Sequence, residues 1–80
     1  MRLIPLQSSN LSGVSYNIST DELFVQFTNG TLYVYHDVPP ESVCAFLFGE
    51  SQGKLFNAII KSGPFSYEKI ENPEEYELDV

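Results

Sequence analysis

The stretch Leu23–Asp37 (LFVQFTNGTLYVYHD) constrains the fold more than any other part of the chain. Two runs rich in β-branched and aromatic residues, Leu23–Thr28 and Thr31–Asp37, flank the dipeptide Asn29-Gly30. Asn and Gly best tolerate the positive φ angles that a two-residue type I′ turn requires. The stretch therefore predicts a tight β-hairpin.

A two-residue turn fixes the register of the hairpin, and side chains that alternate along each strand then form two faces. In this register Val25 lies opposite Val34, and Phe24 lies opposite Tyr35. The first face is mostly aliphatic and is predicted to pack into the core: Leu23, Val25, Phe27, Leu32, Val34 and His36. The second face is polar with three aromatic rings and is predicted to stay open: Phe24, Gln26, Thr28, Thr31, Tyr33, Tyr35 and Asp37. We expect any functional site to start on this second face.

The residues around the hairpin predict further strands. Leu11–Asn17 has Val14 and Tyr16 on the parity that matches the core face of the hairpin, so it completes a three-stranded antiparallel meander. Phe65–Ile70 alternates in the same way and predicts a short fourth strand. Met1–Gln7 is expected to be an extended lead-in.

Two helices are predicted to cover this sheet. Pro39-Pro40 ends the third strand and starts a first helix, because proline cannot donate to a strand ladder but suits the first helical turn. Ser51 is expected to cap a second helix that runs to Lys61. Their apolar sides are Val43, Phe46 and Leu47 in the first helix, and Leu55, Phe56, Ile59 and Ile60 in the second. The predicted fold class is α+β, with two α-helices packed on one face of the meander.

Charge divides the chain into a globular domain, residues 1–70, and an acidic tail, residues 71–80. The net charge is −7, and six of the eleven acidic residues lie within residues 68–80. An acidic protein is a poor general polyanion binder, because lysine and arginine contacts to phosphate supply most non-specific affinity. The single cysteine, Cys44, excludes an internal disulfide and fits a reducing compartment. No segment approaches the length of a membrane span, so we expect a cytoplasmic protein without a membrane partner.

Several short motifs occur in the order and spacing of one known family. They are Ser8-Ser9-Asn10-Leu11, Gly13-Val14-Ser15-Tyr16, Leu23-x-Val25-x-Phe27-x-Asn29-Gly30, Tyr33-Val34-Tyr35, Val38-Pro39 and Ser51-x-Gly53-Lys54-x-Phe56-Asn57. Over residues 6–70 the chain resembles the KTSC domain, which is named for its place at the C-terminus of some lysyl-tRNA synthetases and also occurs as small bacterial and phage proteins. The resemblance implies a domain that binds RNA. We expect no cofactor.

Two groups of residues are candidates for a binding site. Phe24, Tyr33 and Tyr35 form an aromatic patch that could stack unpaired bases. The alternative is that these rings stabilise the sheet as cross-strand pairs, or are covered by the tail or by another subunit. The second group lies on the second helix and could bind an anion, or could be an ordinary cap with a solvated face: Gly53, Lys54, Asn57 and Lys61.

The residues that most often serve catalysis or metal binding are sparse. One histidine and one cysteine cannot fill a zinc site without carboxylates, and no catalytic triad order is present. His36 is predicted to be partly buried on the core side, and Cys44 to be a small core residue. We therefore predict that the protein is not an enzyme and has no metal site.

Two functions remain open. The first is a non-catalytic module that binds single-stranded RNA or a tRNA-like element through Phe24, Tyr33 and Tyr35 with help from Lys54 and Lys61. The second is a protein-interaction module, either a homodimer through the same face or an acidic decoy that uses residues 71–79. The resemblance favours the first function and the net charge favours the second. A third possibility is that the patch is purely structural.

Overall fold

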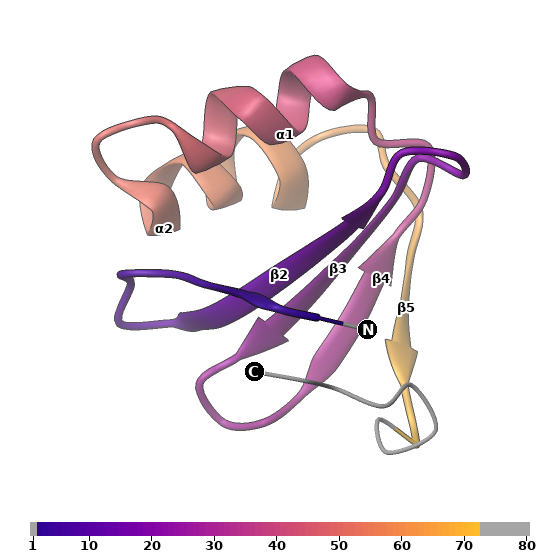
Figure 1. The fold of residues 1–80 in the computed structure, drawn as a ribbon, viewed down its shortest axis with the longest axis horizontal. Coiled ribbons are helices and arrows are strands. Elements are labelled where there is room, and N and C mark those ends of the chain that lie inside the picture. Colours follow the sequence, from indigo (N-terminus) through magenta and orange to yellow (C-terminus); the bar gives the residue numbers. More distant parts are fainter. Residues whose placement is uncertain (1, 73–80) are drawn as a thin grey trace.

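The computed structural model describes residues 2–72 and contains one antiparallel sheet of five strands in the order β1-β2-β3-β4-β5 (Figure 1). The strands are β1 (Ile4–Pro5), β2 (Leu11–Asn17), β3 (Glu22–Phe27), β4 (Leu32–Tyr35) and β5 (Tyr67–Ile70). The α+β class is confirmed, but the sheet is larger than the three or four strands predicted. The extra strand is β1, which pairs with β2 where the sequence predicted only a lead-in. Residues 73–80 of the predicted acidic tail lie outside the described residues.

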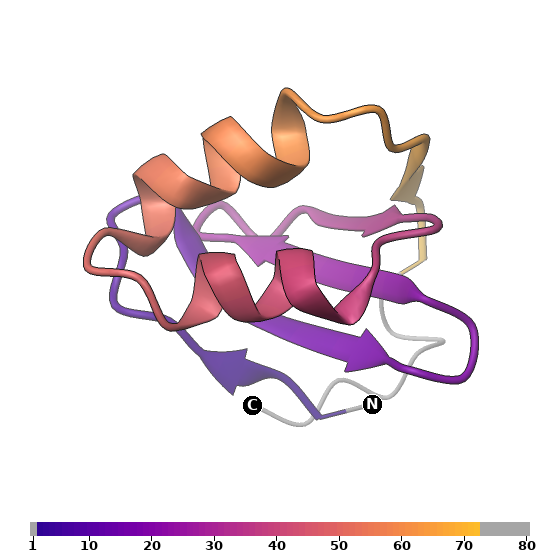
Figure 2. The same cartoon turned by 90° about the horizontal axis from the view of Figure 1, so that it is seen from above.

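Two helical segments cover one face of the sheet (Figure 2). Helix α1 spans Pro40–Leu47, with Pro40 in its first turn as predicted. Helix α2 spans Gln52–Leu55 and continues directly into a π-helix, η1, which spans Phe56–Lys61. The sequence predicted one α-helix over this second region, so its second half differs in type. Ser51 precedes α2 as expected, but its side chain makes no capping hydrogen bond.

The main core lies between the sheet and these helices. Leu23 and Val25 of β3 are 0% exposed, as is Phe46 of α1. The predicted apolar sides are confirmed, because Val43, Phe56 and Ile60 are also buried and Leu47, Leu55 and Ile59 pack against them half-buried. The prediction that Cys44 is a core residue is wrong, because Cys44 is exposed on α1.

The hairpin between β3 and β4 differs from the prediction by one residue. The Phe27 N–H donates to the Thr31 carbonyl at 2.9 Å, which closes a three-residue loop in place of the predicted two-residue turn. Gly30 has a φ of 91°, and the Asn29 side-chain oxygen accepts the Thr31 N–H at 2.9 Å. This loop type combines a turn with a glycine in the left-handed region.

The one-residue shift exchanges the two faces of β4. Val25 lies opposite Tyr33, and Leu23 lies opposite Tyr35. The prediction that both tyrosines lie on an open face is therefore wrong: they lie on the face that the helices cover. Tyr35 is 3% exposed and belongs to the main core.

The opposite face of the sheet carries a second, smaller apolar cluster. Leu32, Val34 and Ile70 form this cluster, and Phe24 packs against it half-buried. His36 follows Val34 by two residues and so belongs to this face as well. Its predicted place on the core side is wrong for the same reason, the shifted register.

Tyr16 ties the turn after β2 to the segment that precedes α1. Its hydroxyl lies 2.7 Å from the Val38 carbonyl and 3.0 Å from the Asp21 carboxylate, so its one proton serves two acceptors. Burial, and after it the Asp21 carboxylate, raises the pKa of Tyr16 to about 12. The Val38 N–H in turn donates to the Asp21 carbonyl at 2.9 Å. These contacts fix the point at which the chain leaves the sheet for the helices.

Within residues 2–72, no helix has the length and apolar character needed to cross a membrane.

Candidate functional site

Two adjoining hollows lie between the hairpin loop, the edge of the sheet and η1. The first, which we call the aromatic hollow, has a volume of about 350 Å³ and is lined by Phe27, Asn29, Thr31, Tyr33, Tyr35, Lys61 and Tyr67. The second, the polar hollow, has a volume of about 280 Å³ and is lined by Asn10, Leu11, Phe27, Thr28, Asn29, Gly53, Phe56, Asn57 and Lys61. Because they share Phe27, Asn29 and Lys61, we treat them as one groove.

Neighbouring strands bring the rings of the aromatic hollow together. Tyr67 of β5 lies opposite Tyr35 of β4, and their ring centroids are 5.4 Å apart. Tyr33 stacks on Tyr67 with the centroids 5.9 Å apart and the planes 19° apart. Phe27 meets Tyr33 edge-on at 5.6 Å. Tyr67 is nevertheless 59% exposed, so this wall presents a large ring surface to solvent.

The phenol group of Tyr35 stays protonated at neutral pH. Burial raises the pKa of Tyr35 above that of a free tyrosine, and the neighbouring Tyr67 and Tyr33 raise it further. A protonated phenol can both donate and accept a hydrogen bond. The aromatic hollow therefore offers flat apolar surface together with polar phenol groups.

The polar hollow is shaped by two loops held against each other. The Thr28 N–H donates to the Asn10 carbonyl at 2.9 Å, which fixes the loop before β2 beside the hairpin loop. The Asn29 side-chain oxygen accepts the Thr31 N–H, which holds the amide in place and leaves its two N–H donors for a ligand. Gly53 allows α2 to lie close to the loop before β2, because a Cβ at this position would lie 3.0 Å from the Ser8 hydroxyl oxygen.

The π-helix η1 has two apolar residues on its core side and two polar residues on its groove side. Phe56 and Ile60 are 1% and 0% exposed and pack into the core. Asn57 and Lys61 directly follow them, are exposed, and line the groove. The Ser62 N–H donates to the Asn57 carbonyl at 3.0 Å, the wider hydrogen-bond spacing of a π-helix. Such segments are rare and occur often at functional sites.

Five of the seven predicted site residues line this groove: Tyr33, Tyr35, Gly53, Asn57 and Lys61. Phe24 does not, because the shifted register leaves it on the opposite face of the sheet. Lys54 lines a third hollow, which shares Asn10, Gly53 and Asn57 with the polar hollow and also contains Glu50. The aromatic patch and the helix residues, predicted as two candidate sites, therefore belong largely to one site.

Sequence reasoning missed several lining residues, among them Phe27, Tyr67, Asn10, Asn29 and Thr31. The predicted alternation assigns Phe27 to the core, and the two asparagines are typical turn residues. Both asparagines nevertheless belong to the short motifs quoted above, so membership of a motif was a usable signal. Tyr67 carried no signal of its own, because its place depends on how β5 pairs with β4.

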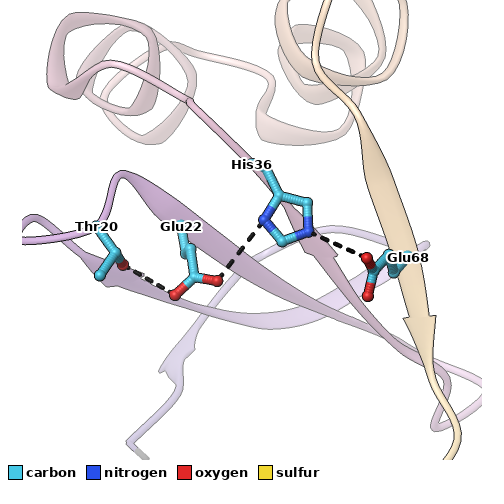
Figure 3. A network of polar contacts seen from close by, with 4 residues as sticks. All are labelled: Thr20, Glu22, His36 and Glu68. Carbon is cyan, nitrogen blue, oxygen red and sulfur yellow. Dashed lines mark hydrogen bonds and ion pairs between the residues drawn. The ribbon is translucent and has the colours of Figure 1, made fainter.

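His36 belongs to a polar network on the other face, outside the groove (Figure 3). Its Nδ1 lies 3.6 Å from Glu22 of β3, and its Nε2 lies 3.7 Å from Glu68 of β5. The Nε2 atom is buried and has no hydrogen-bond partner among residues 2–72. The Thr20 hydroxyl donates to Glu22 at 2.9 Å and holds that carboxylate in place. The ring therefore links three strands, and no cluster of three or more metal-ligating side chains occurs within residues 2–72.

Comparison with known proteins identifies the family. The family model for the KTSC domain matches residues 7–65, which is most of the chain. This chain belongs to the KTSC domain family. The family match confirms the resemblance seen in the motifs and includes nearly all of the groove, with Tyr67 just beyond its end.

Individual relatives agree with this assignment. An uncharacterized protein of Stutzerimonas stutzeri (strain A1501) is 39% identical over 71 residues, covering 89% of this chain and 100% of the relative. A protein of Tsukamurella paurometabola is 37% identical over 57 residues, covering 71% of this chain and 85% of the relative. The crystal structure of a KTSC domain protein from Yersinia pestis superposes with a TM-score of 0.76 at 30% identity, covering 85% of this chain and 94% of that one.

The motifs of the KTSC resemblance meet in space at the groove. Their members in its lining come from four separate segments of the chain: Asn10, Leu11, Phe27, Asn29, Tyr33, Tyr35, Gly53, Phe56 and Asn57. Some of these residues, such as Leu11 and Phe56, are also needed for the core. The exposed polar ones, Asn10, Asn29 and Asn57, have no comparable packing role. The groove is therefore the strongest candidate for a functional site.

Proposed function

We propose that this KTSC domain is a non-catalytic binding module that holds single-stranded RNA in the groove. The observation that carries the proposal is the lining itself, in which solvent-accessible aromatic rings, amide side chains and one lysine come together. Aromatic platforms combined with a cation are the usual means by which proteins bind unpaired nucleotides. No cofactor is required for this function.

The aromatic wall supports base stacking. Tyr67 is 59% exposed and Tyr33 is half-buried, so both rings have surface left for a ligand. A base stacked on such a ring contributes about 1–3 kcal/mol of binding free energy. Tyr35 differs from these two, because it is 3% exposed and therefore packs against the Tyr67 ring and leaves little surface for a ligand.

The charge of the lining also supports an anionic ligand. The chain carries eleven acidic and four basic residues, yet among the described residues Lys61 is the one charged side chain that lines either hollow. The neighbouring hollow around Lys54 includes Glu50. The groove is therefore less acidic than the rest of the chain, which suits RNA and is unfavourable to a cationic ligand.

The absence of a recognisable reaction centre in the lining formed by residues 2–72 supports a binding role over catalysis. Nucleophilic catalysis needs a nucleophile beside a general base. His36 lies on the opposite face of the sheet and Cys44 on the outer side of α1, so neither faces the groove. With one cysteine and no helix in residues 2–72 able to span a membrane, we propose a cytoplasmic location.

The test is the binding of a fluorescent single-stranded RNA octamer, followed by anisotropy at low salt. The double variant Tyr33→Ala/Tyr67→Ala should bind at least about tenfold more weakly, since two stacking surfaces are removed. The control is Phe24→Ala, which removes an aromatic ring from the other face of the same sheet. Equal binding by the double variant and the wild type, with both folded, would refute the proposal.

A second candidate function is supported by the sheet edge. β5 is the last strand of the sheet, and Tyr67, Glu68 and Lys69 within it are exposed. An exposed edge strand can pair with a strand of another chain, including a second copy. This form of the protein-interaction hypothesis predicts a concentration-dependent dimer by sedimentation equilibrium, and a strictly monomeric protein would remove its self-association version.

A further inference from the structure

We infer that the groove engages one nucleotide unit at a time, with the base in the aromatic hollow and its phosphate in the polar hollow beside Lys61. This inference rests on the proposed function and specifies its ligand. It concerns the number of nucleotides held, which neither the family nor the motifs indicate.

The size of the groove limits the ligand. Sites for small molecules usually have volumes of about 300–1,000 Å³. The aromatic hollow, at about 350 Å³, lies at the lower end of that range, and the polar hollow is smaller at about 280 Å³. The two hollows together therefore have the size of a site for one small molecule such as a nucleotide.

The two hollows differ in chemistry as the base of a nucleotide differs from its sugar and phosphate. Tyr33 and Tyr67 offer ring faces in the aromatic hollow, which suit a base. Asn10 and Asn57 offer amide groups in the polar hollow, which suit a sugar and a phosphate. Lys61 lines both hollows, so its ammonium group lies within reach of a phosphate in the polar hollow when the base occupies the aromatic hollow.

The charges near the groove do not provide a path for a longer strand. The polar hollow adjoins the hollow of Lys54 and shares Asn10, Gly53 and Asn57 with it, but Glu50 there offsets the charge of the lysine. Lys69 lies in register with Tyr33 but lines neither hollow. A strand that followed the surface past the groove would gain few phosphate contacts, so one contact at Lys61 should dominate.

The salt dependence of binding directly measures the number of phosphate contacts. For single strands the affinity falls with salt by a power of about 0.7 per phosphate contact. With one contact, raising salt from 50 to 200 mM should weaken binding only about threefold. A site that tracks six phosphates would lose more than about a hundredfold over the same range.

The experiment compares three ligands by NMR titration of the full chain: adenosine 5′-monophosphate, ribose 5-phosphate and an adenylate octamer. We expect the monophosphate to bind within about tenfold of the octamer, and ribose 5-phosphate at least about tenfold more weakly than the monophosphate, because it lacks the stacking base. Lys61→Met should abolish the salt dependence, whereas the matched variant Lys54→Met should leave it unchanged.

The outcomes separate this inference from the proposed function. If the octamer binds through Tyr33 and Tyr67 but the monophosphate does not, or if octamer binding falls more than about a hundredfold with salt, the one-nucleotide site is refuted and RNA binding stands. If ribose 5-phosphate binds as well as the monophosphate, the assignment of the base to the aromatic hollow is refuted. If no ligand binds, both the inference and the proposed function fail.

Discussion

The face of the sheet beneath the helices has two halves that differ sharply in packing. On β2 and β3, the covered half includes Leu11, Val14, Leu23 and Val25, which are at most 1% exposed. On β4 and β5, the open half carries Tyr33, Tyr35 and Tyr67, and the exposed fraction rises from 3% at Tyr35, next to the core, to 59% at Tyr67 at the edge. The first half is closed by aliphatic side chains, while the second keeps aromatic rings beside a groove.

One cross-strand row shows the difference most clearly. Tyr16, Leu23, Tyr35 and Tyr67 lie opposite one another on four successive strands. Tyr16 uses its hydroxyl to tie down the chain at Val38, whereas Tyr67 leaves much of its ring in contact with solvent. The same residue type thus serves stability on one side of the sheet and is available for binding on the other.

The largest expected effect on stability appears when two members of this row, Leu23 and Tyr67, are compared. Leu23→Ala should lower the free energy of unfolding by about 2–5 kcal/mol, because it leaves a cavity in the closed core. Tyr67→Ala should cost only about 1 kcal/mol, through lost ring contacts at an exposed edge. Chemical denaturation measures both values. Similar losses for the two variants would contradict the division into a covered and an open half.

A smaller effect is expected at the loop that sets the faces of β4. Gly30 has a φ of 91°, and a Cβ added there would meet no atom of residues 2–72 within 4 Å, so Gly30→Ala acts through the backbone. The left-handed region costs other residues about 1–2 kcal/mol, and the unfolding free energy should fall by that amount. Thr28→Ala in the same loop should change it by less than about 0.5 kcal/mol. A neutral Gly30→Ala would mean that the loop does not hold this conformation in solution.

The smallest expected effect concerns Tyr16. Tyr16→Phe removes hydrogen bonds to Val38 and Asp21 and should cost about 1 kcal/mol at neutral pH. Because the pKa of Tyr16 is raised in the folded protein from 10.0 to about 12, its contribution is complete below pH 10 and is lost as the pH rises toward 12. The stability difference between wild type and variant should therefore shrink over that interval. A difference that stays constant from about pH 9 to about pH 12 would contradict the assigned contacts.

Much of the fold follows from local sequence patterns. The strands around the hairpin, the helix start at Pro40 and the core positions Val25 and Phe46 were predictable, because each rests on periodicity or on proline geometry. β1 was not, since a two-residue strand that includes Pro5 carries almost no pattern.

The register of β4 could not be predicted from hydrophobicity. The strand reads Leu-Tyr-Val-Tyr, so either parity buries apolar surface and a shift of one residue carries little penalty in the pattern. Asn29-Gly30 suits both a two-residue turn and the observed three-residue loop. Each of Tyr33, Tyr35, Asn57 and Lys61 was predicted as a site residue. That they line the same groove could not be predicted, because it depends on the register of β4.

The most direct test of the groove is a titration of isotopically labelled protein with a single-stranded RNA octamer at low salt, followed by amide chemical shifts. Low salt favours weak electrostatic binding. We predict shifts that concentrate at Asn29, Tyr33, Asn57, Lys61 and Tyr67, while the Phe24 face of the sheet stays unchanged. A spectrum that does not move, or shifts centred on Phe24 and Val34, would contradict the assignment of the groove as the RNA-binding site.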